Sequence, residues 1–213
     1  PLFVWMGEIL FRTKLSENLF KGLSPWMQKL PGGLIHVNVV GCALFAAISG
    51  SSAATVATVG KMSIPELRKR NYPEKILLGS LAGSGTLGLL IPPSIILIIY
   101  GVAVQESIAK LFIAGIIPGI MIALIFMSYV IIWSLINKKE MPKILEEYSF
   151  LEKIKRSKQL LPVILLISAV IGSIYTGIAT ATEAASLGVV GALILSYFQK
   201  SLTLKTFKSS LLG

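Results

Sequence analysis

One short stretch of the chain gathers hydroxyl side chains inside a long apolar segment. The stretch FAAISGSSAATVATVG, residues 45–60, contains two glycines, three serines, two threonines and no charge. Neutral oxygens of this kind, together with unwound backbone carbonyls, are ligands for Na⁺ in membrane transporters. The same small residues also let helices approach closely, and taken alone they fit plain helix packing better than a binding site. A second feature is therefore needed to decide between the two.

Pro92 and Pro93, in the sequence GTLGLLIPPSIILIIYG, supply that feature. Because proline has no N–H, the carbonyls of Gly88 and Leu89 lose their helical partners. The residue before a proline is disfavoured in the α conformation, so Ile91 is expected to unwind as well. The sequence predicts a discontinuous helix with free carbonyl groups at its break.

The two features together describe a site for a cation and an anion. Free carbonyls and hydroxyls suit Na⁺, and the positive end of a helix dipole suits a carboxylate. A helix that starts near Ser52 would direct its N-terminus at the turn formed by residues 49–52. We therefore expect a cation and an organic anion to bind close together.

The composition places this chemistry in a membrane. Of the 213 residues, 54% are hydrophobic and 14% are charged, against about 25% charged in soluble domains. The net charge of +10 comes from lysines and arginines between apolar blocks, which favours a cytoplasmic membrane surface over a nucleic-acid partner. The only cysteine is Cys42 and the only histidine is His36, and Glu8 is the one acid inside an apolar stretch. No catalytic or metal-binding constellation of His, Asp and Glu is visible, so we do not expect an enzyme.

The pattern of apolar blocks and basic loops predicts the topology. The apolar blocks are 2–11, 34–62, 76–104, 108–136, 159–176 and 184–198; the basic loops are 12–33, 61–75, 138–158 and 200–208; and the connections 101–107 and 177–183 have no Lys or Arg. A single crossing by 34–62 would put two basic loops on opposite sides, against the positive-inside rule. Two full crossings by this block would keep the basic loops on one side, but its two halves are too short for that. The parts before and after Gly50 reach only about 22 Å and 15 Å at 1.5 Å per residue, against a hydrocarbon core of about 30 Å.

We therefore expect an all-α, polytopic integral membrane protein in which 34–62 is a re-entrant helical hairpin and 76–104 is a discontinuous helix. All basic loops are then cytoplasmic. Non-helical backbone at membrane depth is tolerated only where it is buried in protein or lines a cavity, which makes the hairpin tip a functional hypothesis. The alternative is one long helix kinked at Gly50.

Four ordered motifs resemble a known family: LPGGLIHVNVVGCALFAAISGSSAATVATVGKMSIPELRKRNY, GTLGLLIPPSIILIIYG, SIAKLFIAGIIPGI and GIATATEAASLG. They are similar to the large membrane subunit, the DctM-like component, of tripartite ATP-independent periplasmic (TRAP) transporters. The resemblance covers the whole chain but only the earlier part of that subunit. A second inverted repeat with its own hairpin is expected to follow Gly213.

The resemblance implies an elevator-type ion transporter fold in the bacterial inner membrane. It implies Na⁺-coupled import of organic anions delivered by a periplasmic binding protein, with a small membrane subunit as a further partner. The chain would divide into 1–33, a scaffold helix end with its cytoplasmic connector; 34–136, half of a transport domain with hairpin 34–62, broken helix 76–104 and helix 108–136; 137–158, a basic cytoplasmic linker; and 159–213, further scaffold helices.

The family pattern also implies site residues. Carried onto this chain, the Na⁺ site between hairpin tip and break falls on Ser49, Ser52, Gly88, Ile91 and Pro93, and the substrate side on Ser51, Thr55, Pro92 and Ser94. One departure is Ala181, where the family's TPTEAA has proline. Glu183 has the spacing of a residue in the first turn of a helix, with Thr180 or Thr182 as its cap.

Two other classes remain open at this stage. In an ion channel, the hairpin tip would be a re-entrant selectivity loop. A non-transporting membrane scaffold would show no ion-dependent stability. C4-dicarboxylates, other carboxylic acids and sialic acids are all handled by the family, and no arginine lies inside an apolar block here to select among them.

Overall fold

The computed structural model describes residues 2–13, 15–142 and 148–212, and this part of the chain is built from helices without strands. In chain order they are α1 (Leu2–Phe11), α2 (Leu15–Met27), the 3-10 helix η1 (Gly33–Ile35), α3 (His36–Ser49), α4 (Ser52–Lys69), α5 (Glu74–Gly85), the 3-10 helix η2 (Thr86–Leu89), α6 (Ile95–Ala103), α7 (Ile108–Ile136), α8 (Phe150–Ser157), α9 (Leu161–Tyr175), α10 (Ala181–Phe198) and α11 (Leu204–Leu212). The all-α prediction is confirmed.

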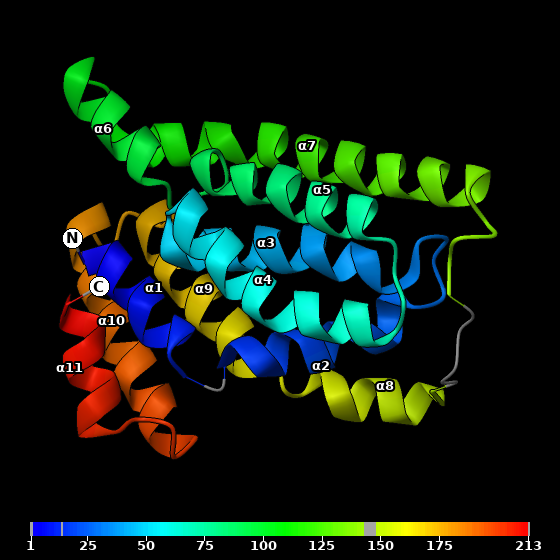
Figure 1. Ribbon diagram of the computed structural model, residues 1–213. Coiled ribbons are helices and arrows are strands. Elements are labelled where there is room, and N and C mark those ends of the chain that lie inside the picture. The colour runs from blue at the N-terminus through cyan, green and yellow to red at the C-terminus, as the bar shows by residue number, and fades with distance from the viewer. Residues whose placement is uncertain (1, 14, 143–147, 213) are drawn as a thin grey trace.

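Helix α3 lies at the centre of the bundle, between α4, α5, α1, α2 and α7 (Figure 1). Cys42, Phe45 and Ile48 are among its fully buried side chains. It returns through the turn at Gly50 into α4, and the two helices pack against each other. The block 34–62 is therefore two antiparallel helices, and the alternative of one long kinked helix is wrong.

Polar contacts fix this hairpin onto the next helix. The buried Asn38 amide of α3 donates to the Leu77 carbonyl (3.2 Å) and to the Ser80 hydroxyl (3.0 Å) of α5. At the base of the hairpin, the Leu34 N–H donates to the hydroxyl of Tyr72 in the α4–α5 turn (3.0 Å). Burial raises the pKa of that hydroxyl, which therefore stays protonated at neutral pH.

The helices pack in two groups. One contains α3, α4, α5, η2, α6 and α7, and the other contains α1, α9, α10 and α11; α1 also contacts α3 and α4. Helix α2 lies beside α3 and carries α8 on its other side. The helices of 34–136 all belong to the first group; the division of the chain into scaffold and transport parts stays a prediction.

The surface of the bundle is that of an integral membrane protein. Large apolar side chains on α7, among them Ile117, Leu124 and Ile136, are more than half exposed, which would be costly in water. Within the described residues, α7 and α10 are long and apolar enough to cross a membrane, and α8 with α9 would add a third span if that bent pair crosses as one.

The basic segments are more helical than the sequence suggested. Helix α2 occupies most of 12–33, α4 runs through Pro65 to Lys69 so that only residues 70–73 remain as a turn, and α11 follows the loop at 200–203. Lys21 of α2, Lys69 of α4 and Lys208 of α11 are exposed on these helices. A search for apolar blocks assigns such amphipathic helices to loops. Part of the linker at 137–158, residues 143–147 with Lys143, lies outside the described residues, as does Lys14 of the first connector.

Helix α10 begins with a capping box. The Thr180 hydroxyl accepts the Glu183 N–H (3.3 Å), and the Glu183 carboxylate accepts the Thr180 N–H (2.8 Å). Of the two caps that the sequence allowed, Thr180 is the one used. Thr182 lies in the first turn, exposed.

Replacing Thr180 with Ala removes the cap and is expected to cost about 1 kcal/mol of stability. Thr182→Ala is the matched control: it deletes a similar side chain two residues away and leaves the cap intact. We expect Thr180→Ala to lower the thermal unfolding temperature of the purified protein and Thr182→Ala to leave it unchanged or slightly higher. Equal decreases for the two variants would contradict the assignment of the cap.

Candidate functional site

The hairpin turns within two residues. Gly50 takes the left-handed conformation (φ 59°) that closes α3, and its N–H donates to the Ala46 carbonyl (3.1 Å). A left-handed residue at a helix end is ordinarily glycine, because a Cβ is strained there. Ser51 is extended and caps α4, with its hydroxyl accepting the Ala54 N–H (3.4 Å). This geometry explains why glycine is followed by serine at the tip.

The hydroxyls of the tip form a small network. The Ser49 and Thr55 hydroxyl oxygens are 2.9 Å apart, and either can donate to the other. The hydroxyl that does not donate in this pair can donate to the Ser51 carbonyl, at 3.2 Å from Ser49 or 2.7 Å from Thr55. Both side chains are fully buried. Each hydroxyl oxygen keeps lone pairs that a cation can use. The network holds the turn rigid and concentrates neutral oxygen atoms in it.

The proline segment is broken as predicted, and the break is longer than expected. Helix α5 ends at Gly85, η2 follows to Leu89, and regular structure resumes only at Ile95. The Leu89 carbonyl has no helical partner because Pro93, four residues later, has no N–H. It accepts a hydrogen bond from the hydroxyl of the buried Ser94 (2.7 Å). Among the described residues no donor reaches the Gly88 carbonyl. The prediction of free carbonyls therefore holds for Gly88 and not for Leu89.

The hairpin tip lies directly against this break. The Ser52 hydroxyl donates to the Gly85 carbonyl (2.6 Å), and the Ile95 N–H donates to the Gly50 carbonyl (3.3 Å). A Cβ added to Gly88 would lie 3.0 Å from the nitrogen and from the Cα of Ser52. The two segments, far apart in the sequence, therefore meet backbone to backbone.

Four helix ends converge at this contact. The C-terminal ends of α3 and η2 bring carbonyl groups, and the N-terminal ends of α4 and α6 bring N–H groups. Carbonyl ends carry partial negative charge and suit a cation, while N–H ends carry partial positive charge and suit an anion. The arrangement can hold both kinds of ion without a charged side chain.

The predicted residues do not all face the contact. Ser51, Ser52 and Gly88 meet there, and the Pro93 carbonyl lies 2.9 Å from the place a Gly50 Cβ would take. Ser49 belongs to the tip, where its hydroxyl bonds to Ser51 and Thr55, and its backbone lies against Gly7 of α1. The side chains of Ile91 and Pro92 instead pack against Gly119 and Gly115 of α7. Ser94 and Thr55 are buried, with their hydroxyls bonded to backbone carbonyls. The roles of all these residues in binding stay predictions.

Sequence reasoning missed two members of the contact, the Gly85 carbonyl and the Ile95 N–H. The signal in the sequence was the glycine itself, because small residues let backbones approach closely. In the structure, a Cβ added to Gly85 would overlap Val56 of the hairpin. It belongs to GSGTLG, a glycine spacing without a strand before it, which does not fit a nucleotide loop. The glycines of this motif serve close packing.

Helix α1 closes the other side of the tip. An added Cβ on Gly7 would lie 2.8 Å from the Cα of Ser49, so these two helices also touch backbone to backbone. The next residue, Glu8, pairs with Arg12 one turn later (3.0 Å). This pair accounts for the single acid within an apolar block.

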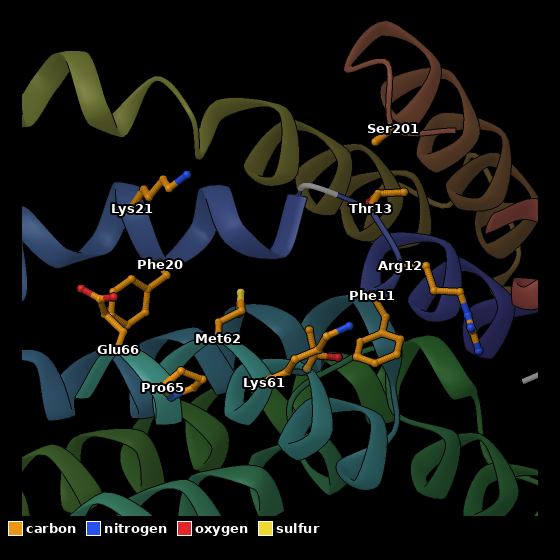
Figure 2. A pocket seen from close by; sticks show the side chains of 11 residues that line it. Phe11, Arg12, Thr13, Phe20, Lys21, Lys61, Met62, Pro65, Glu66 and Ser201 are labelled. Atoms are coloured by element: carbon orange, nitrogen blue, oxygen red, sulfur yellow. The ribbon is translucent and has the colours of Figure 1, made fainter. Parts of the chain in front are cut away.

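Two cavities of the described residues lie outside this contact, and neither is lined by the predicted site residues. An apolar cavity of about 280 Å³ lies between α1, α6, α7 and α10 and is lined by Phe3, Ile95 and Ala185, among others. A cavity of about 580 Å³ lies between the α1–α2 connection and α4. Figure 2 shows Lys61 of α4 pointing toward Phe11 there, with the Lys61 ammonium 5.2 Å from the ring centre.

The chain matches known proteins along its whole length. The family model described as "Tripartite ATP-independent periplasmic transporter, DctM component" matches residues 1–213. A C4-dicarboxylate TRAP transporter large permease protein DctM of Pseudomonas aeruginosa is 36% identical over 198 residues, which is 93% of this chain and 46% of that protein. The sialic acid TRAP transporter permease protein SiaT of Haemophilus influenzae is 35% identical, over 99% of this chain and 34% of that protein.

A third relative is the ectoine/5-hydroxyectoine large permease protein UehC of Ruegeria pomeroyi, 34% identical over 92% of this chain and 45% of that protein. The chain thus spans about half the length, or less, of these curated relatives. They are permease proteins, not enzymes, and each is named for a different substrate.

Gly88→Ala tests the contact between tip and break. The added methyl meets the Ser52 backbone and is expected to cost about 1–3 kcal/mol through overpacking. Gly79→Ala is the matched control, because an added Cβ there meets nothing within 4 Å and alanine favours its helix. We expect a lower thermal unfolding temperature for the first variant and an unchanged or higher one for the second. A Gly88→Ala protein as stable as Gly79→Ala would contradict the close approach.

Proposed function

Because the chain belongs to the DctM-component family of tripartite ATP-independent periplasmic transporters, we propose that it forms the first ion-binding half of a Na⁺-coupled importer of organic anions. The observation that carries the proposal is the contact of the hairpin tip with the proline break. It bonds the Ser52 hydroxyl to the Gly85 carbonyl and brings the Ser51–Ser52 backbone against Gly88, whose carbonyl has no donor among the described residues, while the Ser49 hydroxyl lies in the same tip, bonded to Thr55 and the Ser51 carbonyl. Na⁺ accepts neutral oxygen ligands of this kind.

In this proposal the ligands of Na⁺ come from Ser49, Ser52 and the backbone of Gly88, Ile91 and Pro93. The Ser52 hydroxyl hydrogen is already directed at Gly85, which leaves the oxygen lone pairs for the ion. The cation joins the hairpin to the broken helix, so its binding stabilises the arrangement of both segments.

The anion would bind on the side of the helix N-termini. The first N–H groups of α4 and α6 lie next to the turn, with Ser51 and Ser94 as their N-cap residues. A carboxylate suits that place because of the positive ends of the two helix dipoles. Relatives named for C4-dicarboxylate and for sialic acid share this half of the protein. We therefore propose a carboxylic acid as substrate class.

The hairpin is proposed to be re-entrant, entering from the cytoplasmic side of a bacterial inner membrane. Its helices α3 and α4 are 14 and 18 residues long. The last turns of α4 carry Arg68 and Lys69, which belong at a cytoplasmic surface. We propose an elevator mechanism, in which the group that contains the hairpin, α3 to α7, moves as a unit against the group of α1, α9 and α10.

The partners proposed from the family are a periplasmic substrate-binding protein and a small membrane subunit. The words "tripartite" and "periplasmic" in the family description support the presence of these two further components. The names of the relatives, all permease proteins, favour a transporter over the channel that the re-entrant loop alone would also fit.

Ser49→Ala/Ser52→Ala tests the ion site without knowledge of the substrate. We expect the full-length permease to unfold at a higher temperature in NaCl than in KCl of equal ionic strength, because an ion that binds only the folded state stabilises it, by about 2.7 kcal/mol at 100 times the Kd. The double variant should lose this difference. Ser128→Ala, which removes an exposed serine hydroxyl from α7, should keep it.

The same variants are then reconstituted in proteoliposomes together with the small membrane subunit, and uptake of labelled succinate supplied with the periplasmic binding protein is compared in a sodium gradient. Loss of uptake together with loss of the sodium-dependent stability supports the site. A double variant with an unchanged difference between NaCl and KCl would overturn the assignment of the two serines. A wild-type protein without such a difference would overturn sodium binding itself.

A further inference from the structure

Helix α8 is a short basic helix that the transport proposal leaves without a role. It follows the segment 143–147 and leads directly into α9, from whose axis it bends by 53°. It packs against α2 at the lower edge of the bundle (Figure 1). An isolated helix of eight residues is not stable in water, so contacts must hold it in place.

Those contacts centre on Trp26 of α2. The Trp26 indole N–H donates to the Ser157 hydroxyl (2.7 Å), and its ring meets the Phe150 ring edge-on with centroids 6.4 Å apart. The Lys153 ammonium lies 5.5 Å from the centre of the Trp26 ring. One tryptophan therefore contacts both ends and the middle of α8.

The N-terminal end of α8 is also fixed. Ser149 and Glu152 form a capping box, in which the Glu152 carboxylate accepts the Ser149 N–H (2.9 Å). The only acid of the helix is therefore engaged in its cap. The Arg156 guanidinium stacks 4.2 Å from the centre of the Tyr148 ring.

The exposed face of α8 combines apolar and cationic side chains. Leu151 is 76% and Ile154 is 42% exposed. Lys155 and Lys158 follow these two residues at a spacing of four and are exposed beside them. A rigid helix that presents leucine and isoleucine flanked by lysines has the form of an interfacial amphipathic helix.

We propose that this face, Leu151, Ile154, Lys155 and Lys158, binds the anionic phospholipid of the membrane leaflet next to it. Its apolar side chains enter the boundary between headgroups and acyl chains, and its lysines contact the lipid phosphates. Charge selects this occupant: residues 150–158 contain four cations and one carboxylate. Position supports it as well, since apolar α9 begins three residues after Lys158.

Lipid binding at this place has a mechanical consequence. Helix α8 belongs to the connection between α7 in one group of helices and α9 in the other. The lipid surface and Trp26 together then fix the beginning of α9 and the end of α2. The connection is held at the membrane surface while the other elements remain free to move.

Site-specific fluorescence tests the proposal on the full-length protein in nanodiscs. Cys42 is fully buried, so a cysteine introduced at an exposed position can be labelled with the environment-sensitive dye NBD. Leu151→Cys reports on the proposed face, and Glu140→Cys, exposed in the turn after α7, serves as the control position. Nanodiscs of phosphatidylcholine alone are compared with nanodiscs containing phosphatidylglycerol.

We expect NBD at position 151 to shift to shorter wavelength and to be quenched by doxyl-labelled lipid, more strongly with phosphatidylglycerol. NBD at position 140 should show neither change. Inorganic phosphate added to phosphatidylcholine nanodiscs should not reproduce the shift, which distinguishes lipid phosphate from free phosphate. Position 151 behaving like position 140 in both lipids would overturn the proposal.

Charge reversal then tests the lysines. Lys155→Glu/Lys158→Glu should abolish the response of position 151 to phosphatidylglycerol. Lys69→Glu/Lys75→Glu makes the same change in net charge at two exposed positions on α4 and α5 and should preserve the response. Lys155→Gln/Lys158→Gln, which keeps good helix formers, should reduce it without unfolding α8. An equal loss in the control double variant would show a general surface field and overturn specific binding by α8.

Discussion

The contact of two glycine-containing backbones, the hairpin tip and the proline break, determines the arrangement of the surrounding helices. Gly50 allows the turn, and Gly88 lets the break approach Ser52 as closely as backbone atoms can. Gly7 brings α1 against the same turn from the other side. Because glycine has no Cβ, the backbones of these segments can come into direct contact. This close contact allows four helix ends to lie together at one place. Helix α3, buried almost entirely, then carries the turn to the middle of the bundle.

This arrangement explains why the site contains hydroxyl and peptide groups in place of charged side chains. An ionised side chain buried without a partner is expensive in an apolar environment. Peptide dipoles and serine hydroxyls have no net charge, and their buried groups satisfy one another, as in the network of Ser49, Thr55 and the Ser51 carbonyl. Glu8 of α1, next to Gly7, is paired with Arg12 just beyond the end of that helix.

The sequence predicts the parts of this site that depend on local chemistry. Segment length and loop charge indicated a hairpin, and the missing N–H of Pro92 indicated a free Gly88 carbonyl. Contacts between distant segments are not encoded in such local patterns. The Ser94 hydroxyl satisfies Leu89, Gly85 accepts from Ser52, and the side chains of Ile91 and Pro92 turn toward α7, all because of tertiary packing. The same limit applies to α2 and α11, where amphipathic helices with outward lysines looked like basic loops.

The geometry also bears on how an ion at this place would act on the protein. Tip and break are joined by the Ser52–Gly85 and Ile95–Gly50 hydrogen bonds, so direct contacts within the protein hold the two segments together. A cation at the proposed site would add attraction between these two segments. Its binding free energy therefore appears as stability of the contact between the hairpin and the broken helix. Because the N-terminal ends of α4 and α6 belong to the same two segments, that stability also fixes the N–H groups proposed for the anion. Coupling between cation and anion then follows from their shared backbone and requires no pathway through the rest of the bundle.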